Sequence, residues 1–202
     1  MASGQDARIR FVVGLGNPTP QYEGTRHNVG FLVLADLRRR WDLGPGRQAF
    51  DGLRNDACLA AADGPVRVVL LEPHTYMNCS GAAVQKMVAF YKADCQDVLI
   101  VLDDLALPLG RLRARPGGSA GGHRGLADIQ RALGTDQVPR LRIGIGSPPP
   151  QMDWVDYVLS RFRPDEQEAV DQAVRQAAAA VEDWLRHDLT YVMERYNPEA
   201  QD

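Results

Sequence analysis

The sequence predicts a single three-layer α/β domain in which helices flank a mixed or mostly parallel β-sheet. Candidate strands and helices alternate along the chain, which is the pattern of this class. Two apolar runs, residues 11–13 and 98–102, lack polar alternation and indicate strands that are covered on both faces. The length of 202 residues fits one domain, or at most a domain and a half.

The expected elements follow from hydrophobic periodicity. Apolar runs predict strands at residues 8–15, 56–62, 66–72, 98–103 and 141–145. Residues 109–115 alternate instead, which suits a half-exposed strand. Helical spacing predicts helices at 29–41, 81–92, 126–133 and 165–187, and a short helix at 154–160 after a proline-rich turn. Loops rich in glycine and asparagine follow strand ends, where open α/β sheets form their sites.

The distribution of charge bears on the class of partner. The 23 Lys and Arg against 26 Asp and Glu give a net charge of -3, which argues against a general nucleic-acid coat protein. Residues 108–147, however, carry seven arginines against two aspartates, whereas residues 148–202 carry five basic and 12 acidic groups. A local basic segment of this kind can guide one phosphate-bearing end of a nucleic acid.

Three features of the sequence predict the limits of the domain and the cellular compartment of the protein. Residues 1–7 are small and polar and predict a short tail before a domain spanning 8–195, with a second tail at 196–202. No stretch approaches the 18 or so consecutive apolar residues of a membrane span, so we expect no membrane partner. An odd number of cysteines without a C-x-x-C pair predicts reduced thiols of a cytoplasmic protein rather than disulfides or zinc ligands: Cys58, Cys79 and Cys95.

Asn17 and His27 are the first candidate site residues. A G-x-G turn precedes them, but Thr19 stands where a dinucleotide-binding fingerprint needs glycine, which counts against a nucleotide cofactor. Asn17 is placed to project its amide into a cleft. His27 lies just before a helix, and an apolar strand ends at Asp103 and Asp104; a carboxylate there would orient the imidazole and leave its other nitrogen to take a proton from water. Either aspartate fits this role.

Residues 77–81 open another helix after a strand. Ser80 or Asn78 as the N-cap of that helix is the simpler interpretation. Asn78 as a neutral donor and acceptor within a site is the alternative.

The glycine-rich loop at residues 117–125 has two interpretations. Its backbone N–H groups can turn toward a ligand, and the helix that follows favours an anion there. Residues 117–121 also fit G-x-S-x-G with Ser119 as nucleophile and His187 later in the chain, but the preceding segment is alternating and arginine-rich rather than a buried strand. Arginines at alternate positions flank the loop and suggest a phosphate clamp, with a solvated sheet edge as the alternative: Arg111, Arg113, Arg115, Arg140 and Arg142.

Six sequence blocks, taken together, resemble the bacterial-type peptidyl-tRNA hydrolases. They keep that family's order and spacing from about residue 8 to residue 195: G-L-G-N-P (14–18), T-R-H-N-V-G-F (25–31), M-N-C-S-G (77–81), D-D-L-A-L-P-L-G (103–110), G-S-A-G-G-H-R-G-L (118–126) and R-L-R-I-G-I-G (140–146). The resemblance implies hydrolysis of the ester between a peptide and the 3′ ribose of tRNA, which recycles tRNA from prematurely released peptidyl-tRNA. It also implies a twisted mixed sheet in one α/β domain, usually monomeric, with no metal and no cofactor.

The resemblance also implies roles for individual positions. His27 matches the catalytic histidine and Asp103 its partner acid, and residues 148–160 match a mobile cover over the cleft. The positions that match the peptide-binding and water-placing part of the cleft are Asn17, Tyr22, Met77, Asn78, Gly121 and Arg124. Arg115 and Arg142 fall where the family places basic residues that clamp the 5′-phosphate of the tRNA.

Two positions depart from the family's pattern. Arg124 stands in place of an asparagine of the site, and Ala106 in place of an acid. Arginine cannot accept a hydrogen bond and adds charge. Two alternatives to the hydrolase stay open: a non-hydrolytic RNA-binding relative, such as the chloroplast RNA-splicing factors built on this fold, and a serine esterase that uses Ser119.

Overall fold

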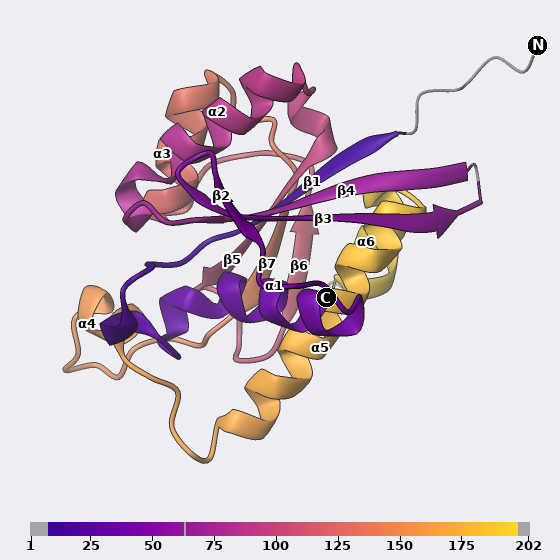
Figure 1. Ribbon diagram of the computed structural model, residues 1–202. Helices are drawn as coiled ribbons and strands as arrows, with labels where there is room; N and C mark the ends of the chain where they lie inside the picture. The colour runs from indigo at the N-terminus through magenta and orange to yellow at the C-terminus, as the bar shows by residue number, and fades with distance from the viewer. Residues whose placement is uncertain (1–7, 63, 198–202) are drawn as a thin grey trace, which may run out of the picture.

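The computed structural model describes residues 8–62 and 64–197. A seven-stranded sheet forms its centre, in the order β2-β3-β4-β1-β5-β7-β6 (Figure 1). The strands are β1 (Ile9–Gly14), β2 (Arg47–Ala49), β3 (Gly52–Ala61), β4 (Gly64–Pro73), β5 (Val98–Asp104), β6 (Leu112–Arg115) and β7 (Arg140–Gly144). The four inner strands β4, β1, β5 and β7 pair in parallel, whereas β2–β3, β3–β4 and β6–β7 pair antiparallel. The sheet is therefore mixed.

Helices cover both faces of the sheet, with α1 and α5 on one face and α2 and α3 on the other (Figure 1). The helices are α1 (Val29–Arg40), α2 (Ser80–Tyr91), α3 (Arg124–Leu133), α4 (Trp154–Leu159), α5 (Gln167–Arg186) and α6 (Leu189–Tyr196). Phe11 and Val13 of β1 belong to the apolar cluster under α2 and α3, while Val12 belongs to the cluster under α1 and α5. The apolar run of β1 is thus buried on both faces, and the expected three-layer α/β fold is confirmed.

The sequence missed two elements of this fold. β2 has three residues of mixed polarity, and it is a strand because it pairs with β3. α6 follows Asp188, whose side chain accepts a hydrogen bond from the Tyr191 N–H and caps the helix. Of the residues expected in a C-terminal tail, Tyr196 ends α6, and Asn197 exchanges two hydrogen bonds with the backbone of Ala114 in β6. The expected tail at 1–7, and residues 198–202, lie outside the described residues.

Close packing of α1 against the sheet decides where the candidate site forms. A Cβ on Gly30, in the first turn of α1, would lie 2.4 Å from the Leu15 nitrogen and 2.5 Å from the Val101 oxygen. Only glycine permits this approach, because both obstacles are backbone atoms. The short 3-10 helix just before α1 is thereby held beside the ends of β1 and β5. None of the described helices is long and apolar enough to cross a membrane.

Candidate active site

The carboxyl ends of the parallel strands meet at one edge of the sheet, and a cavity of about 430 Å³ lies there. Nine of the ten candidate residues line it: Asn17, Tyr22, His27, Met77, Asn78, Asp103, Gly121, Arg124 and Arg142. Arg115 does not line it. Positions up to 125 residues apart in the chain are therefore gathered around one hollow.

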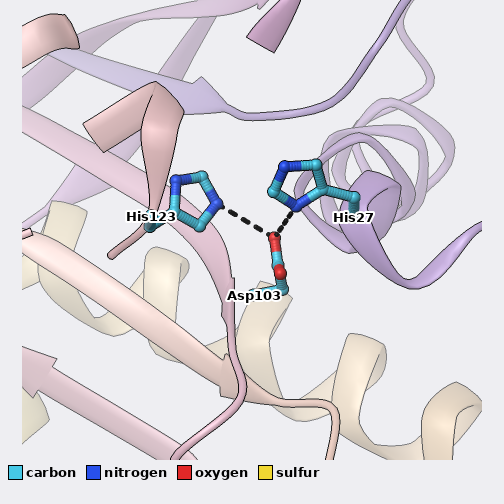
Figure 2. Close-up of side chains that lie close together, drawn as sticks. All are labelled: His27, Asp103 and His123. Atoms are coloured by element: carbon cyan, nitrogen blue, oxygen red, sulfur yellow. Dashed lines mark hydrogen bonds and ion pairs between the residues drawn. The ribbon is translucent and has the colours of Figure 1, made fainter. Parts of the chain in front are cut away.

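A carboxylate shared by two histidines forms the polar centre of the cavity (Figure 2). Asp103, near the end of β5, is buried, and its Oδ1 lies 2.8 Å from Nδ1 of His27 and 3.0 Å from Nε2 of His123. Asp104 instead pairs with Arg142 at 3.1 Å. The structure thus decides between the two aspartates, and it is Asp103 that holds His27.

The charge of Asp103 follows from its neighbours. Burial by itself raises the pKa of this carboxyl. The two histidines beside it lower the pKa by charge and by hydrogen bonding, and together they outweigh the effect of burial. The net pKa of Asp103 therefore lies well below its usual range. An ionised carboxylate only accepts hydrogen bonds, so each histidine presents an N–H to it.

The two histidines differ in what their second nitrogen does. Nδ1 of His123 accepts a hydrogen bond from the Leu126 N–H at 3.2 Å, as the N-cap of α3, so both of its ring nitrogens are engaged. His27 uses Nδ1 for Asp103, and its Nε2 has no hydrogen-bond partner among the described residues. With Nδ1 protonated, Nε2 of His27 carries a lone pair toward the cavity. The hydrogen-bond network, from which these tautomers are assigned, leaves only His27 free to take up a proton.

His123 and Asn28 are site residues to which the sequence assigned no role. Both stand inside the motif blocks, so block membership was the available signal, but their contacts are set by distant segments. Asn28 exchanges two hydrogen bonds with the backbone of Asn17, at 2.8 and 2.9 Å. The Asn17 side-chain oxygen in turn accepts a hydrogen bond from the Met77 N–H at 2.9 Å. The Asn17 amide is therefore oriented, and its NH₂ group remains available to a ligand.

Of residues 77–81, Met77 and Asn78 line the cavity. Met77 and Asn78 belong to a 3-10 helix, Met77–Cys79, and Met77 is buried while Asn78 is exposed at the cavity. The N-cap of α2 is Cys79 and no side chain caps that helix, so the expectation of Ser80 or Asn78 as the cap is wrong. Ser80 donates its hydroxyl to the Met77 carbonyl instead. Tyr22, at the end of a 3-10 helix (Pro20–Tyr22), adds a half-buried aromatic ring.

The arginines beside the glycine-rich loop have separate tasks. Arg140 is 1 % exposed and donates to the carbonyls of Val138, Gly118 and Asp136, so its assignment to a phosphate-facing row is wrong. The buried guanidinium holds the start of the glycine-rich loop against the segment before β7. The alternating positions of the arginines in the sequence could not show this. Arg142 reaches the cavity and donates to the Ser119 carbonyl at 3.3 Å. Gly121, at φ +60°, leaves room for it, since a Cβ there would lie 3.1 Å from Arg142 Nη2.

Arg115 and Ser119 both lie outside the cavity lining. Arg115 is exposed on β6, the edge strand, directly opposite Arg140. Ser119 is exposed in the loop after that edge strand, and His187 stacks on Tyr191 at the end of α5, with ring centroids 4.2 Å apart. A nucleophile elbow needs a serine at the end of a buried central strand. The G-x-S-x-G motif therefore does not form one here.

Arg26 connects the segment of His27 to residues 148–160. Its backbone N–H donates to the Ser160 carbonyl at 3.0 Å, and its buried guanidinium pairs with Glu166 at 2.5 Å. The same guanidinium lies over the rings of Tyr157 and Phe162, at 4.3 and 4.8 Å from their centroids. α4 is thereby held beside the start of α1 (Figure 1). Nothing in the sequence around Arg26 predicted that its side chain would be buried and would join these two segments.

The three central side chains are also the group that could hold a metal ion among the described residues. Donor atoms of His27, Asp103 and His123 lie within 4.8 Å of one another. The histidine nitrogens that face Asp103, Nδ1 of His27 and Nε2 of His123, are hydrogen-bonded to its Oδ1. A metal bound through these two nitrogens would have to displace both N–H protons, so its binding would be coupled to proton release. The residues fit proton transfer without such a displacement.

Comparison with known proteins identifies the family. The family model described as peptidyl-tRNA hydrolase matches residues 11–202. Among the most similar relatives, a peptidyl-tRNA hydrolase from Synechococcus sp. (strain JA-3-3Ab) is 45% identical over 96% of this chain and 85% of its own, and one from Bacillus cytotoxicus is 42% identical over 94% and 100%. The crystal structure of peptidyl-tRNA hydrolase from Acinetobacter baumannii superposes with a TM-score of 0.84 at 34% identity, over 94% of each chain. The chain therefore belongs to the peptidyl-tRNA hydrolase family, and its activity is peptidyl-tRNA hydrolysis.

Proposed function

We propose that His27 is the general base of this hydrolysis and activates the attacking water. The observation that supports it is the difference between the two histidines: Asp103 orients both, but only His27 keeps an unengaged ring nitrogen at the cavity. A positioned base of this kind typically contributes about 10²–10⁴ in rate. The neighbouring carboxylate stabilises the imidazolium that forms.

The reaction proceeds in two steps on this geometry. The water oxygen bonds to the ester carbonyl carbon while its proton passes to Nε2 of His27. The tetrahedral intermediate then breaks its bond to the ribose 3′ oxygen, which takes the proton from His27 and leaves as a hydroxyl. The carboxyl of the peptide leaves with the water oxygen. An ester with this leaving group needs neither a covalent nucleophile nor a metal in the proposal.

The asparagines supply donors for the oxyanion and the peptide. Asn17 is held by Met77 and Asn28, so its NH₂ is preorganised where negative charge develops. A donor of this kind is typically worth about 3 kcal/mol in the transition state. Asn78, Tyr22 and the Gly121 backbone would complete the peptide side of the cleft.

Arg115 and Arg142 serve in the proposal as the phosphate clamp for tRNA. Arg115 is exposed on the edge strand, and Arg142 extends from the neighbouring strand into the cavity. Loss of a phosphate contact weakens binding and makes its salt dependence shallower, by about one in slope for each contact. Arg115→Ala should therefore raise KM and flatten the salt dependence of binding, and an unchanged slope would remove Arg115 from the clamp.

We also propose that the protein acts as a monomer in the cytoplasm and recycles tRNA from peptidyl-tRNA released early by ribosomes. The described residues of one chain suffice to line the cavity. Residues 8–195 would act as one domain, because a single sheet carries all the strands that frame the cavity.

The decisive test is cleavage of an N-acetylated aminoacyl-tRNA by the wild type and by His27→Ala. The variant should lose about 10²–10⁴ in kcat with little change in tRNA affinity. His74→Ala is the matched control, because that histidine is exposed and outside the cavity. Normal turnover by His27→Ala would contradict the assignment. An RNA-binding relative without activity would bind tRNA and leave the ester intact in the wild type as well.

A further inference from the structure

One cation at the cavity has no balancing charge among residues 8–62 and 64–197. Asp103 is engaged by two histidines, and Arg142 pairs with Asp104. Arg124, the first residue of α3, also lines the cavity and is exposed, and its side chain makes no hydrogen bond or ion pair within the described part of the chain. Its guanidinium donors are therefore open to a ligand, in a hollow whose carboxylates are already occupied.

Trp154 restricts where this guanidinium can lie. Arg124 Cζ is 5.3 Å from the centroid of the Trp154 ring, and Trp154 lines the same cavity. Trp154 is the first residue of α4, which is anchored through the buried Tyr157, whose hydroxyl donates to the Ile145 carbonyl at 2.8 Å. An aromatic face beneath a guanidinium orients it and leaves the N–H groups at its edge free to donate. The pair thus presents a preplaced cation rather than a mobile surface arginine.

We propose that Arg124, oriented by Trp154, recognises an anionic oxygen group of the substrate and is a specificity-determining residue of the reaction. The inference rests on the proposed function in taking the cavity as the substrate cleft. The planar fork of a guanidinium matches the paired oxygens of a phosphate or a carboxylate. Peptidyl-tRNA can bring this chemistry close to the ester from two sides, through the phosphodiester of its last nucleotide or through an acidic side chain on the last residue of the peptide.

The test uses two esters of the same tRNA, N-acetyl-aspartyl and N-acetyl-asparaginyl, with Arg124→Asn, Arg124→Lys and Trp154→Leu. A lost charge-assisted hydrogen bond should lower kcat/KM about tenfold or more in Arg124→Asn, mainly through KM. Arg124→Lys should recover part of the loss, since it restores the charge without the fork. Trp154→Leu should show a smaller loss in the same parameter. Arg131→Asn is the matched control, because Arg131 lies on the same helix, pairs with Asp128 and is outside the cavity.

The outcomes separate the two sources and can overturn the proposal. An equal loss for both esters, with a shallower salt dependence, assigns the anion to the phosphodiester, whereas a loss confined to the aspartyl ester assigns it to the peptide. A change below about twofold for both esters, or an equal loss in Arg131→Asn, overturns the role of Arg124. Failure of the proposed base would appear elsewhere, as normal kcat in His27→Ala, and would leave the KM effect of Arg124 measurable.

Discussion

Replacement of Asp103 by asparagine tests how the buried carboxylate contributes to turnover. Both histidines present an N–H to the same oxygen of Asp103, at 2.8 and 3.0 Å. An asparagine can place its carbonyl oxygen at that point and accept both hydrogen bonds. Asp103→Asn should therefore keep both tautomers and remove only the negative charge, which separates electrostatics from orientation.

The magnitude follows from the distance between charges. The imidazolium formed on His27 spreads its charge over both nitrogens, so its mean distance from the carboxylate is about 4 Å, and the interaction at an effective dielectric of about 20 is about 4 kcal/mol. That corresponds to a loss of about 10³ in kcat. The assay is single-turnover cleavage of an N-acetylated aminoacyl-tRNA, with Asp104→Asn as the neighbouring control. Asp104 pairs with Arg142, so its replacement should act mainly on KM. A loss of kcat below tenfold in Asp103→Asn would refute this reasoning.

Three further predictions concern the elements that hold the site. Arg26→Met should lower the free energy of unfolding by about 3 kcal/mol, because Glu166 stays buried without its cation; a cost below about 1 kcal/mol in urea unfolding would contradict this. Burial acts to raise the pKa of Glu166, but hydrogen bonds from Arg26 and the Arg163 backbone leave it below its usual value. The stability from this ionised carboxylate is therefore present above the unfolded pKa and lost as pH falls through the folded pKa, and Glu166→Gln should flatten the stability profile below about pH 4.5; an unaltered profile would count against it. Gly30→Ala should cost about 1–3 kcal/mol and lower kcat as well, because backbone atoms must move beside His27; full stability and activity together would show that α1 tolerates the shift.

Local pattern accounts for most of the fold. The apolar runs of β1 and β5 predicted strands that are buried on both faces, since a strand covered on two sides carries apolar residues at successive positions rather than at alternate ones. β2 was not predicted because its pairing with β3, rather than its own three residues, makes it a strand. α6 has eight residues, of which only Val192 is buried, so its apolar pattern was too short to predict a helix although Asp188 caps it. The same limit explains Arg140, whose alternation suggested an exposed row while the tertiary fold buries it against loop carbonyls.

The candidate site likewise has some features that sequence motifs predicted and others that only the folded structure shows. Motif blocks were enough to nominate His27, Asn17, Asn78 and a terminal aspartate, because each block follows a strand end where α/β sheets form their clefts. Distances between blocks that are 20 to 76 positions apart decided the rest, including Asp103 over Asp104 and the place of His123.

The sequence by itself determined the class of fold, the family and the residue types at the site, since these depend on periodicity and on short motifs. Only the tertiary structure decided that one carboxylate oxygen serves two histidines and that Arg124 lies over Trp154. Within the described residues, it also left Nε2 of His27 without a hydrogen-bond partner and the Arg124 guanidinium without an acidic partner. Hydrogen-bond direction and charge balance are properties of contacts between distant segments, and such contacts exist only once the chain has folded.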